Sequence, residues 1–239
     1  MVEQPCLQTE RLLLRPFVLA DAADVQRLAG EREIAAFTTN IPHPYEDGVA
    51  EQWIGTHQEA FEQGRAAHWA IVLRDQGSLI GAIGLSIQRE HARAELGYWI
   101  GRPYWGRGYC SEAARAVLRY GFTALGLNRI YATHMRSNPA SGRVMQKIGM
   151  RYEGRLRQHV LKWGVFEDLE VYSILKGEYE AGAFQFTGKR EPMSGLYRAT
   201  SGTPTQQVSV YPRADAKVPR GLKCTHTRPW SWPLGESGV

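Results

Sequence analysis

The stretch that decides the fold runs from Arg102 to Arg115 and reads RPYWGRGYCSEAAR. One residue separates Gly106 from Gly108, and an alanine-rich run with helical spacing follows them. The first amides of a helix have no partner within the helix, and the helix dipole adds a partial positive charge there. Because glycines let a ligand approach the backbone closely, this stretch predicts a phosphate-binding loop that opens a helix.

Two common nucleotide-binding motifs do not fit this loop. A Rossmann site has GxGxxG after the first strand and an acidic residue about 20 residues further on. The loop lacks the third glycine and does not follow the first strand. A P-loop needs Gly-Lys followed by Ser or Thr, which is also absent. The anion is therefore expected to bind in another way.

Apolar periodicity and turn residues around the loop predict an α/β fold. Strands are expected within residues 7–17, 68–88, 94–101 and 129–135, with a turn at 75–77, and a final hairpin is expected to turn near 162–165. Helices are expected over 21–29, 47–63, 111–125 and 139–148, with a broken helix and loop at 31–46. This order predicts a layered sandwich with a mixed, mostly antiparallel central sheet flanked by helices.

The charge of the chain divides it into two parts. The whole sequence has a formal net charge of +5, but residues 1–182 hold 21 basic and 21 acidic residues, whereas 183–239 hold 8 and 3. The balanced part is expected to be one folded domain, and its neutrality argues against a nucleic-acid-binding face. The remainder is rich in Pro, Ser, Thr and Gly, which is typical of a disordered extension.

Other features of the composition narrow the class of protein. No run approaches the roughly 18 apolar residues that cross a bilayer, and the start MVEQPCLQTE lacks the features of a signal peptide, so we expect a cytoplasmic protein with no membrane partner. The three cysteines lie far apart and form no CxxC pair, so no metal site is indicated.

A second informative segment is SNPASGRVMQKIGM, residues 137–150. Together with the glycine loop, it resembles the GCN5-related N-acetyltransferase (GNAT) superfamily, and particularly its RimJ/RimL branch, which acetylates the N-terminal alanine of ribosomal proteins. TERLLLRPF, AELGYWI and FEDLEVYSIL extend the resemblance over about residues 7–180. The resemblance implies an acyltransferase that uses acetyl-CoA as co-substrate and needs no metal.

The resemblance also implies a set of cofactor-binding residues. The family loop has Gln or Arg, two residues, Gly, one residue, then Gly or Ala, and wraps the pyrophosphate of coenzyme A. Trp105 here replaces its polar first residue, and Cys110 takes its last, small position; a buried packing role for Cys110 is preferred to a catalytic thiol. Asn138 matches the contact to the pantetheine arm, although an asparagine before Pro139 also suits a helix N-cap. The expected set is Trp105, Gly106, Arg107, Gly108, Tyr109, Cys110, Asn138 and Arg143.

Glu95 and Ser141 are the expected catalytic residues. Alternation puts Glu95 on one strand face with Gly97 and Trp99, opposite Ala94, Leu96 and Tyr98. Similar enzymes use a glutamate on this strand as base, and a backbone amide near Leu96 or Gly97 would stabilise the oxyanion. Ser141 matches the residue that protonates the leaving thiolate in this branch. An ion pair with Arg93 or Arg89 remains the structural alternative for Glu95, and a polar residue in a helical first turn remains the one for Ser141.

Three further sets of residues are left open. His134 and His159 are rival bases, since the unperturbed pKa of histidine suits proton transfer. Some branch members have a base glutamate near the position of Val160, which this sequence lacks. The loop Phe37–Tyr45, with Trp53 and Trp163, either lines the acceptor pocket or belongs to the core.

The predicted function is transfer of acetyl from acetyl-CoA to a primary amine by direct attack on the thioester. A protein N-terminal α-amine is the first expected acceptor. Alternatives are a small amine, such as an antibiotic, polyamine or amino acid, and a non-catalytic acyl-CoA-binding module. No nucleic-acid partner is expected, and a homodimer is left open.

Overall fold

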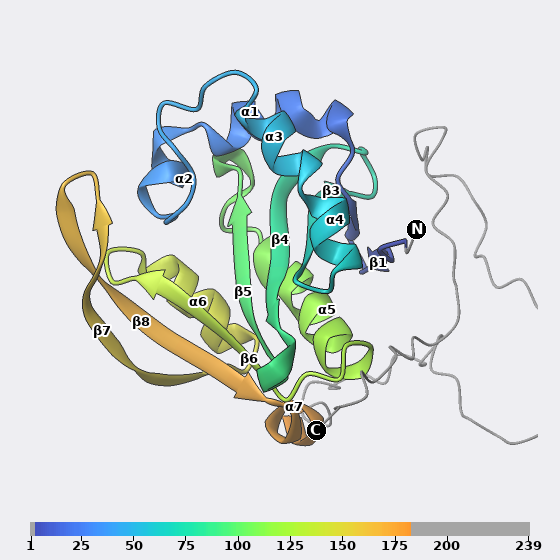
Figure 1. The fold of residues 1–239 in the computed structure, drawn as a ribbon, viewed down its shortest axis with the longest axis vertical. Coiled ribbons are helices and arrows are strands. Elements are labelled where there is room, and N and C mark those ends of the chain that lie inside the picture. The colour runs from blue at the N-terminus through green and yellow to red at the C-terminus, as the bar shows by residue number, and fades with distance from the viewer. Residues whose placement is uncertain (1–2, 183–239) are drawn as a thin grey trace, which may run out of the picture.

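The computed structural model describes residues 3–182, and one eight-stranded sheet runs through them (Figure 1). The strands are β1 (Leu7–Gln8), β2 (Leu12–Pro16), β3 (Ala66–Leu73), β4 (Leu79–Gln88), β5 (Arg93–Ile100), β6 (Arg129–Met135), β7 (Arg151–Lys162) and β8 (Val165–Leu175). Their spatial order is β1-β2-β3-β4-β5-β6-β8-β7. Every neighbouring pair is antiparallel except β5 with β6, so the predicted mixed, mostly antiparallel sheet is confirmed. The extension predicted over 183–239 lies outside the described residues.

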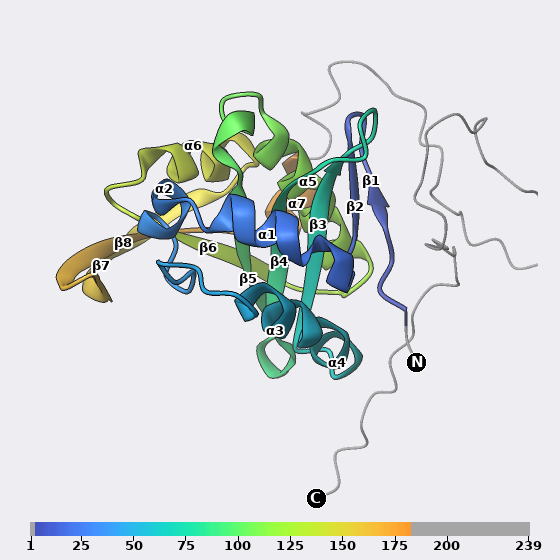
Figure 2. The ribbon, with the colours of Figure 1, turned by 90° about the horizontal axis from the view of Figure 1, so that it is seen from above.

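Helices cover both faces of the sheet. They are α1 (Ala22–Ala29), α2 (Arg32–Ala36), α3 (Val49–Gly55), α4 (His57–Glu62), α5 (Tyr109–Thr123), α6 (Pro139–Lys147) and α7 (Lys176–Gly182). Figure 2 shows α5 and α6 on one side of the sheet and α1 and α3 on the other. The larger core packs α5 on the sheet, and a smaller core packs α1 and α3 on the opposite face.

Alternation along β5 assigns its side chains to these two cores. Ala94 and Leu96 are buried in the larger core with α5, whereas Trp99 packs against the smaller core. Because successive side chains of a strand point to opposite faces, Glu95 lies on the α1 and α3 face and Tyr98 on the α5 face. The predicted alternation therefore holds.

The sheet opens between β5 and β6. The two strands are in register only at Arg93 with Arg129, Ala94 with Ile130 and Glu95 with Tyr131. Beyond these pairs β5 continues to Ile100 and β6 to Met135 without pairing with each other, and Figure 1 shows the strands diverging. Backbone groups on the facing edges are therefore available to a ligand, and the glycine loop follows directly from the open end of β5.

Three predicted boundaries are wrong. The helix expected over 47–63 is two helices that meet at Thr56, whose hydroxyl donates to Trp53 O (2.8 Å). The strand expected over 7–17 is interrupted by a turn in which Thr9 N donates to Leu12 O (2.9 Å). Helix α5 begins at Tyr109, two residues earlier than predicted, because Gly108 adopts a left-handed conformation (φ 80°) that starts the helix.

Candidate active site

The glycine loop forms an open cradle of backbone. Gly106 (φ 73°) and Gly108 (φ 80°) are both left-handed, a conformation that other residues adopt only with strain. A Cβ at Gly106 would meet no atom within 4 Å, and one at Gly108 would meet only the Arg11 guanidinium, at 3.6 Å. All residues from Trp105 to Gly108 are exposed. The space above both glycines is thus free for a ligand.

The start of α5 completes this cradle. Glu112 N donates to Gly108 O (3.1 Å), so the amides of Tyr109, Cys110 and Ser111 precede the first complete helical turn. The indole of Trp105 donates to Ile100 O (2.5 Å) and ties the loop to the end of β5. Left-handed glycines followed by the first turn of a 15-residue helix are typical of a phosphate-binding site.

Cys110 has a packing role. Its side chain packs against the larger core, and burial raises the pKa of its thiol far above the ordinary value. Since the thiolate is the nucleophilic form, a thiol held neutral is a poor nucleophile.

Asn138 and Ser141 open helix α6 together. Asn138 caps the helix, with its Oδ1 accepting a hydrogen bond from Ser141 N (3.3 Å). The Ser141 hydroxyl lies 2.9 Å from the Tyr98 hydroxyl, which also donates to Ser141 O (3.2 Å). Burial and the neighbouring Cys110 raise the pKa of Tyr98, against the opposing effect of the Ser141 hydrogen bond. Tyr98 is therefore a neutral hydroxyl that holds Ser141, a contact that sequence reasoning missed.

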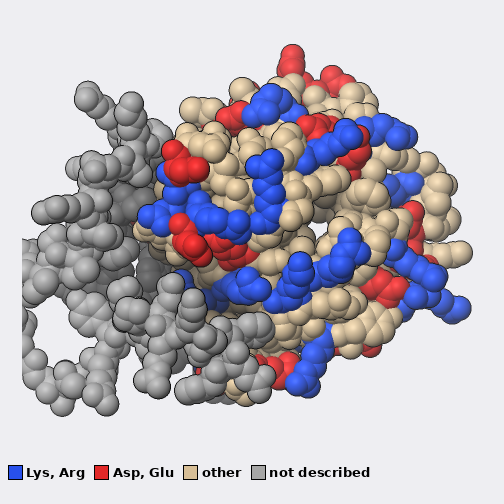
Figure 3. All heavy atoms as spheres, turned by 180° about the vertical axis from the view of Figure 1, so that it is seen from behind, with Lys and Arg blue, Asp and Glu red and all other residues tan. Residues whose placement is uncertain are grey.

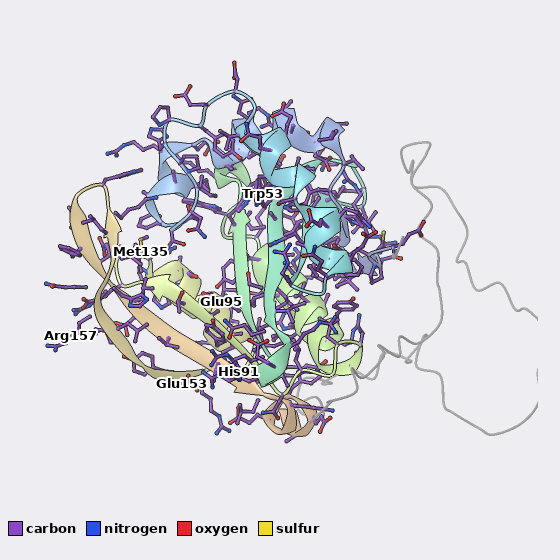
Figure 4. The ribbon with its side chains drawn as sticks, in the orientation of Figure 1. Trp53, His91, Glu95, Met135, Glu153 and Arg157 are labelled. Atoms are coloured by element: carbon purple, nitrogen blue, oxygen red, sulfur yellow. The ribbon has the colours of Figure 1, made fainter. Side chains whose placement is uncertain are left out.

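Glu95 lies on the other face of β5, at the last residue pair before the strands diverge (Figure 4). It is half-buried, and its carboxylate accepts hydrogen bonds from Thr133 Oγ1 (3.2 Å) and Tyr131 Oη (3.4 Å). Arg93, the suggested ion-pair partner, donates instead to Gln88 Oε1 (2.6 Å). Glu95 and Ser141 thus approach the divergence from opposite faces.

The rival histidines lie elsewhere. His134 is buried on the α6 side, where a Cβ at Gly142 would come within 2.6 Å of its Nε2. His159 is exposed where the pairing of β7 with β8 is irregular.

A second carboxylate, Glu167, lies on the same face of the sheet as Glu95. Glu167 is the cross-strand partner of Val160 and accepts a hydrogen bond from Ser137 Oγ (3.3 Å). Sequence reasoning missed it because it looked for an acid on β7 itself.

The tip of the β7–β8 hairpin closes onto the loop after α2. Lys162 Nζ donates to Thr38 O (2.8 Å) and Ile41 O (3.3 Å), and burial lowers the pKa of Lys162. The ring of Trp163 lies 5.9 Å from that of His43. Trp163 and this loop are therefore brought together.

Trp53 does not join them. Its ring packs against Phe17 and His57, at centroid distances of 5.0 and 4.4 Å, and Figure 4 shows it near α3, well away from Glu95. Its role is core packing.

The face behind the sheet is rich in basic side chains. Seen from behind, the described part carries many Lys and Arg residues, and an opening through it is visible between them (Figure 3). Arg143 is exposed on α6. Such a surface suits a ligand that carries several phosphates.

Comparison with known proteins identifies the family. The model of the acetyltransferase (GNAT) domain matches residues 11–151. The chain belongs to the GNAT acetyltransferase family. The uncharacterized N-acetyltransferase YoaA of Bacillus subtilis (strain 168) is 36% identical over 173 residues, which are 72% of this chain and 97% of YoaA. This GNAT chain is thus an enzyme, an N-acetyltransferase.

Two RimJ/RimL-type proteins are among the similar ones. The [ribosomal protein uS5]-alanine N-acetyltransferase of Escherichia coli (strain K12) is 27% identical over 187 residues, covering 74% of this chain and 93% of that enzyme. The solved structure of RimL, a ribosomal L7/L12 α-N-protein acetyltransferase in complex with coenzyme A, has a TM-score of 0.66 and 17% identity, and covers 71% of this chain and 97% of that one. The latter shows the shared fold.

Residues 3–182 contain neither a candidate membrane-spanning helix nor a metal-binding cluster. In this part of the GNAT chain, no helix combines the length and apolar character needed to span a membrane. Within the same residues, no group of three or more His, Cys, Asp or Glu side chains is arranged to hold a metal ion.

Proposed function

We propose that this enzyme transfers acetyl from acetyl-CoA to the α-amine of a protein N-terminus, by direct attack of the amine on the thioester. The observation that carries the proposal is the arrangement of Glu95 and Ser141 on opposite faces of the β5–β6 divergence. A base and an acid on either side of one opening are what acetyl transfer to an amine requires.

The residues proposed to hold the cofactor come from the glycine loop, the start of α5 and helix α6. The amides of Gly106, Arg107, Gly108 and Cys110 would bind the pyrophosphate at the start of α5. Asn138 uses its Oδ1 to cap α6, so its amide nitrogen is the group that would donate to the pantetheine arm. Arg143, exposed on α6, adds positive charge. Acetyl-CoA supplies the acetyl group as a thioester.

Glu95 is proposed to accept the proton of the amine. An N-terminal ammonium has a pKa of about 8, against about 10.4 for lysine, so a carboxylate at neutral pH deprotonates it more easily. The hydrogen bonds from Thr133 and Tyr131 orient the carboxylate. An amide of β5 near Leu96 or Gly97, on the edge that β6 leaves open, would stabilise the developing oxyanion.

Ser141 is proposed to hold the proton for the departing sulfur. A serine hydroxyl is a weak acid, and the Tyr98 hydroxyl at 2.9 Å can replace the proton as it leaves. The two hydroxyls thereby form a short donor chain on the α5 face.

Two observations support a protein N-terminus as the acceptor. Lys162 fastens the hairpin tip to the loop after α2. An acceptor side bounded by this contact would favour a narrow chain end over a side chain on a folded surface. A similar protein, 27% identical, carries the name [ribosomal protein uS5]-alanine N-acetyltransferase.

Acceptor preference is the first experiment. CoA release would be measured with peptides that begin with Ala or Ser, the same peptides with a blocked N-terminus and an internal lysine, spermidine and an aminoglycoside. We expect release with free N-termini and at least tenfold less with blocked ones. Faster release with spermidine or the aminoglycoside would instead assign a small-molecule acceptor.

The base is tested by Glu95→Gln with Glu167→Gln as its matched control, since both carboxylates lie on one face. Loss of a general base costs about 10²- to 10⁴-fold in rate. We expect Glu95→Gln to lower kcat within this range with the Kd of CoA unchanged, and Glu167→Gln to keep most activity. A Glu95→Gln enzyme as fast as wild type between pH 6 and 9 would exclude Glu95 as base.

A further inference from the structure

The turn at Thr9–Arg11 lies against the start of α5, about one hundred residues away in sequence. Thr9 Oγ1 donates to Glu112 Oε1 (2.6 Å), as does Arg11 N (2.9 Å). The Arg11 side chain forms a two-pronged pair with the same carboxylate, with Nε at 2.7 Å and Nη2 at 2.6 Å. Arg74 Nη1 donates to Thr9 O and Glu10 O (both 2.9 Å), so the turn is anchored from behind.

Glu112 is a charged group at an unfavourable place for an anion-binding site. Burial raises the pKa of its carboxyl, but the hydrogen bonds from Thr9 and Arg11 and the charge of Arg11 outweigh burial and lower it. The carboxylate therefore stays ionised in the first turns of α5, next to the amides that face the cradle. An unpaired carboxylate there would repel a phosphate.

Arg11 also touches the glycine loop itself. Its Nη1 donates to Arg107 O (3.1 Å), and its guanidinium lies 4.6 Å from the centroid of the Tyr109 ring. One side chain thus joins the carbonyl in the middle of the loop, the first residue of α5 and Glu112. The hydrogen bond holds the carbonyl of Arg107 toward Arg11.

These groups border an open pocket of about 580 Å³. Its lining includes Arg11, Gly108, Ser111, Glu112, Arg115 and Lys147. Arg115 provides an internal comparison, because it has the same charge and lines the same pocket but donates to Lys147 O.

We propose that Arg11 is a positioning residue of the phosphate loop, which neutralises Glu112 and fixes the Arg107 carbonyl so that the site accepts the pyrophosphate of coenzyme A. The inference rests on the cofactor site of the proposed function and adds to it a role for the TERLLLRPF segment. That segment belongs to the first strands, and only the fold brings it to the loop.

The test is CoA affinity by calorimetry on the full chain. We expect Arg11→Met to raise the Kd about 10- to 100-fold, the range for a lost hydrogen-bonded charge. Glu112→Gln in the Arg11→Met background should recover most of this loss, because the uncompensated carboxylate is gone. Arg115→Met, the matched control, should raise the Kd less than about threefold. Thermal unfolding without CoA checks that each variant is folded.

Any of three results would overturn the inference. The first is a Kd of Arg11→Met equal to that of wild type, and the second is a loss of CoA affinity in Arg115→Met as large as that in Arg11→Met. The third is a double variant that binds CoA no more tightly than Arg11→Met, which would make Arg11 a direct phosphate ligand. If Arg11→Met does not fold, Arg11→Lys replaces it. Lysine keeps the charge but cannot bridge Glu112 and Arg107 at once. A several-fold weaker Kd supports the bridge, and an unchanged one contradicts it.

Failure here is distinguishable from failure of the proposed function. Wild-type protein that binds CoA but acetylates no N-terminal peptide overturns the proposed acceptor and leaves the Arg11 inference standing. Equal CoA affinity of wild type and Arg11→Met overturns the inference and leaves the proposed function standing.

Discussion

At the scale of the residue, Ser141 shows how a side chain acquires a role from its neighbours. Its amide is used in the cap by Asn138 and its hydroxyl is held by Tyr98. Both alternatives posed for Asn138 from sequence are thus physically compatible, since capping uses only its oxygen. The hydroxyl of Ser141 is directed by a tyrosine 43 residues away along the chain.

Replacing Tyr98 with Phe tests this arrangement. The variant keeps the ring that packs against the larger core and removes only the hydroxyl. We expect kcat to fall about tenfold, in line with a lost hydrogen bond of about 1 kcal/mol or slightly more, with the Kd of CoA within about twofold of wild type. Steady-state kinetics and calorimetry measure the two. A fall in CoA affinity with kcat unchanged would mean that Tyr98 only shapes the cofactor site.

At the scale of the element, the packing of α6 against β6 decides where Asn138 and Ser141 lie. Gly142 follows Ser141 and packs directly on the ring of His134, so the helix approaches β6 more closely than a side chain would allow. His134 Nδ1 lies 2.8 Å from Met135 O, which fixes the ring. A residue considered as a base is therefore a support for the helix that carries the proposed acid.

Replacing Gly142 with Ala tests whether the close packing of α6 on His134 matters. The new Cβ would lie 2.6 Å from His134 Nε2, so the helix or the ring must move. Overpacking of this kind costs about 1 to 3 kcal/mol. We expect a lower midpoint of thermal unfolding and a lower kcat. Ala140→Ser, on the exposed side of the same helix, should change neither, and a fully active Gly142→Ala enzyme would show that the position of α6 is not critical.

The tip of the β7–β8 hairpin is the second element, and it is proposed to bound the acceptor side. Lys162→Ala removes both hydrogen bonds to the loop after α2 and should loosen the acceptor side. We expect KM for an N-terminal peptide to rise several-fold with CoA affinity unchanged. Arg157→Ala is the control, because Arg157 is exposed on the same hairpin and points away from the molecule in Figure 4. Equal KM values for both variants would argue against a role of the tip in acceptor binding.

At the scale of the whole molecule, two neutral histidines link stability to pH. The rings of His57 and His68 lie 4.6 Å apart, and both ring nitrogens of His57 are buried without a hydrogen-bond partner in the described part. Burial lowers the pKa of His57 to about 3, with a further contribution from His68, and burial lowers that of His68 to about 4. Protonation of either ring therefore opposes folding.

The two histidines make the folded protein less stable as the pH falls. Below the unfolded pKa of about 6.5 the unfolded chain binds protons that the folded chain does not, so stability falls as pH falls from about 6.5 toward 4. We expect a loss of about 1 kcal/mol per pH unit for each histidine, measured by urea unfolding between pH 7 and 5. His57→Phe should reduce this slope. A slope unchanged by the substitution would assign the acid sensitivity to other groups.

Most of the fold could be predicted from local pattern. Alternation assigned β5 to its two faces, turn residues located both hairpins, and the glycine loop located the start of a helix. The errors at Thr56, at the Thr9 turn and at Tyr109 arise where single hydrogen bonds or a left-handed glycine decide where an element begins or ends, and periodicity does not report them.

The sequence by itself determined the family and the sheet class and predicted the cofactor loop, because period-two alternation, glycine spacing and helix-start chemistry are local properties. Only the tertiary structure decided that Glu95 and Ser141 meet one opening from opposite faces, that Tyr98 holds Ser141, that Glu167 shares the face of Glu95, and that Arg11 reaches Glu112 and the loop. The physical reason is that these contacts join residues 40 to 100 positions apart, and the pairing and divergence of strands, which depend on the whole sheet, set their distances.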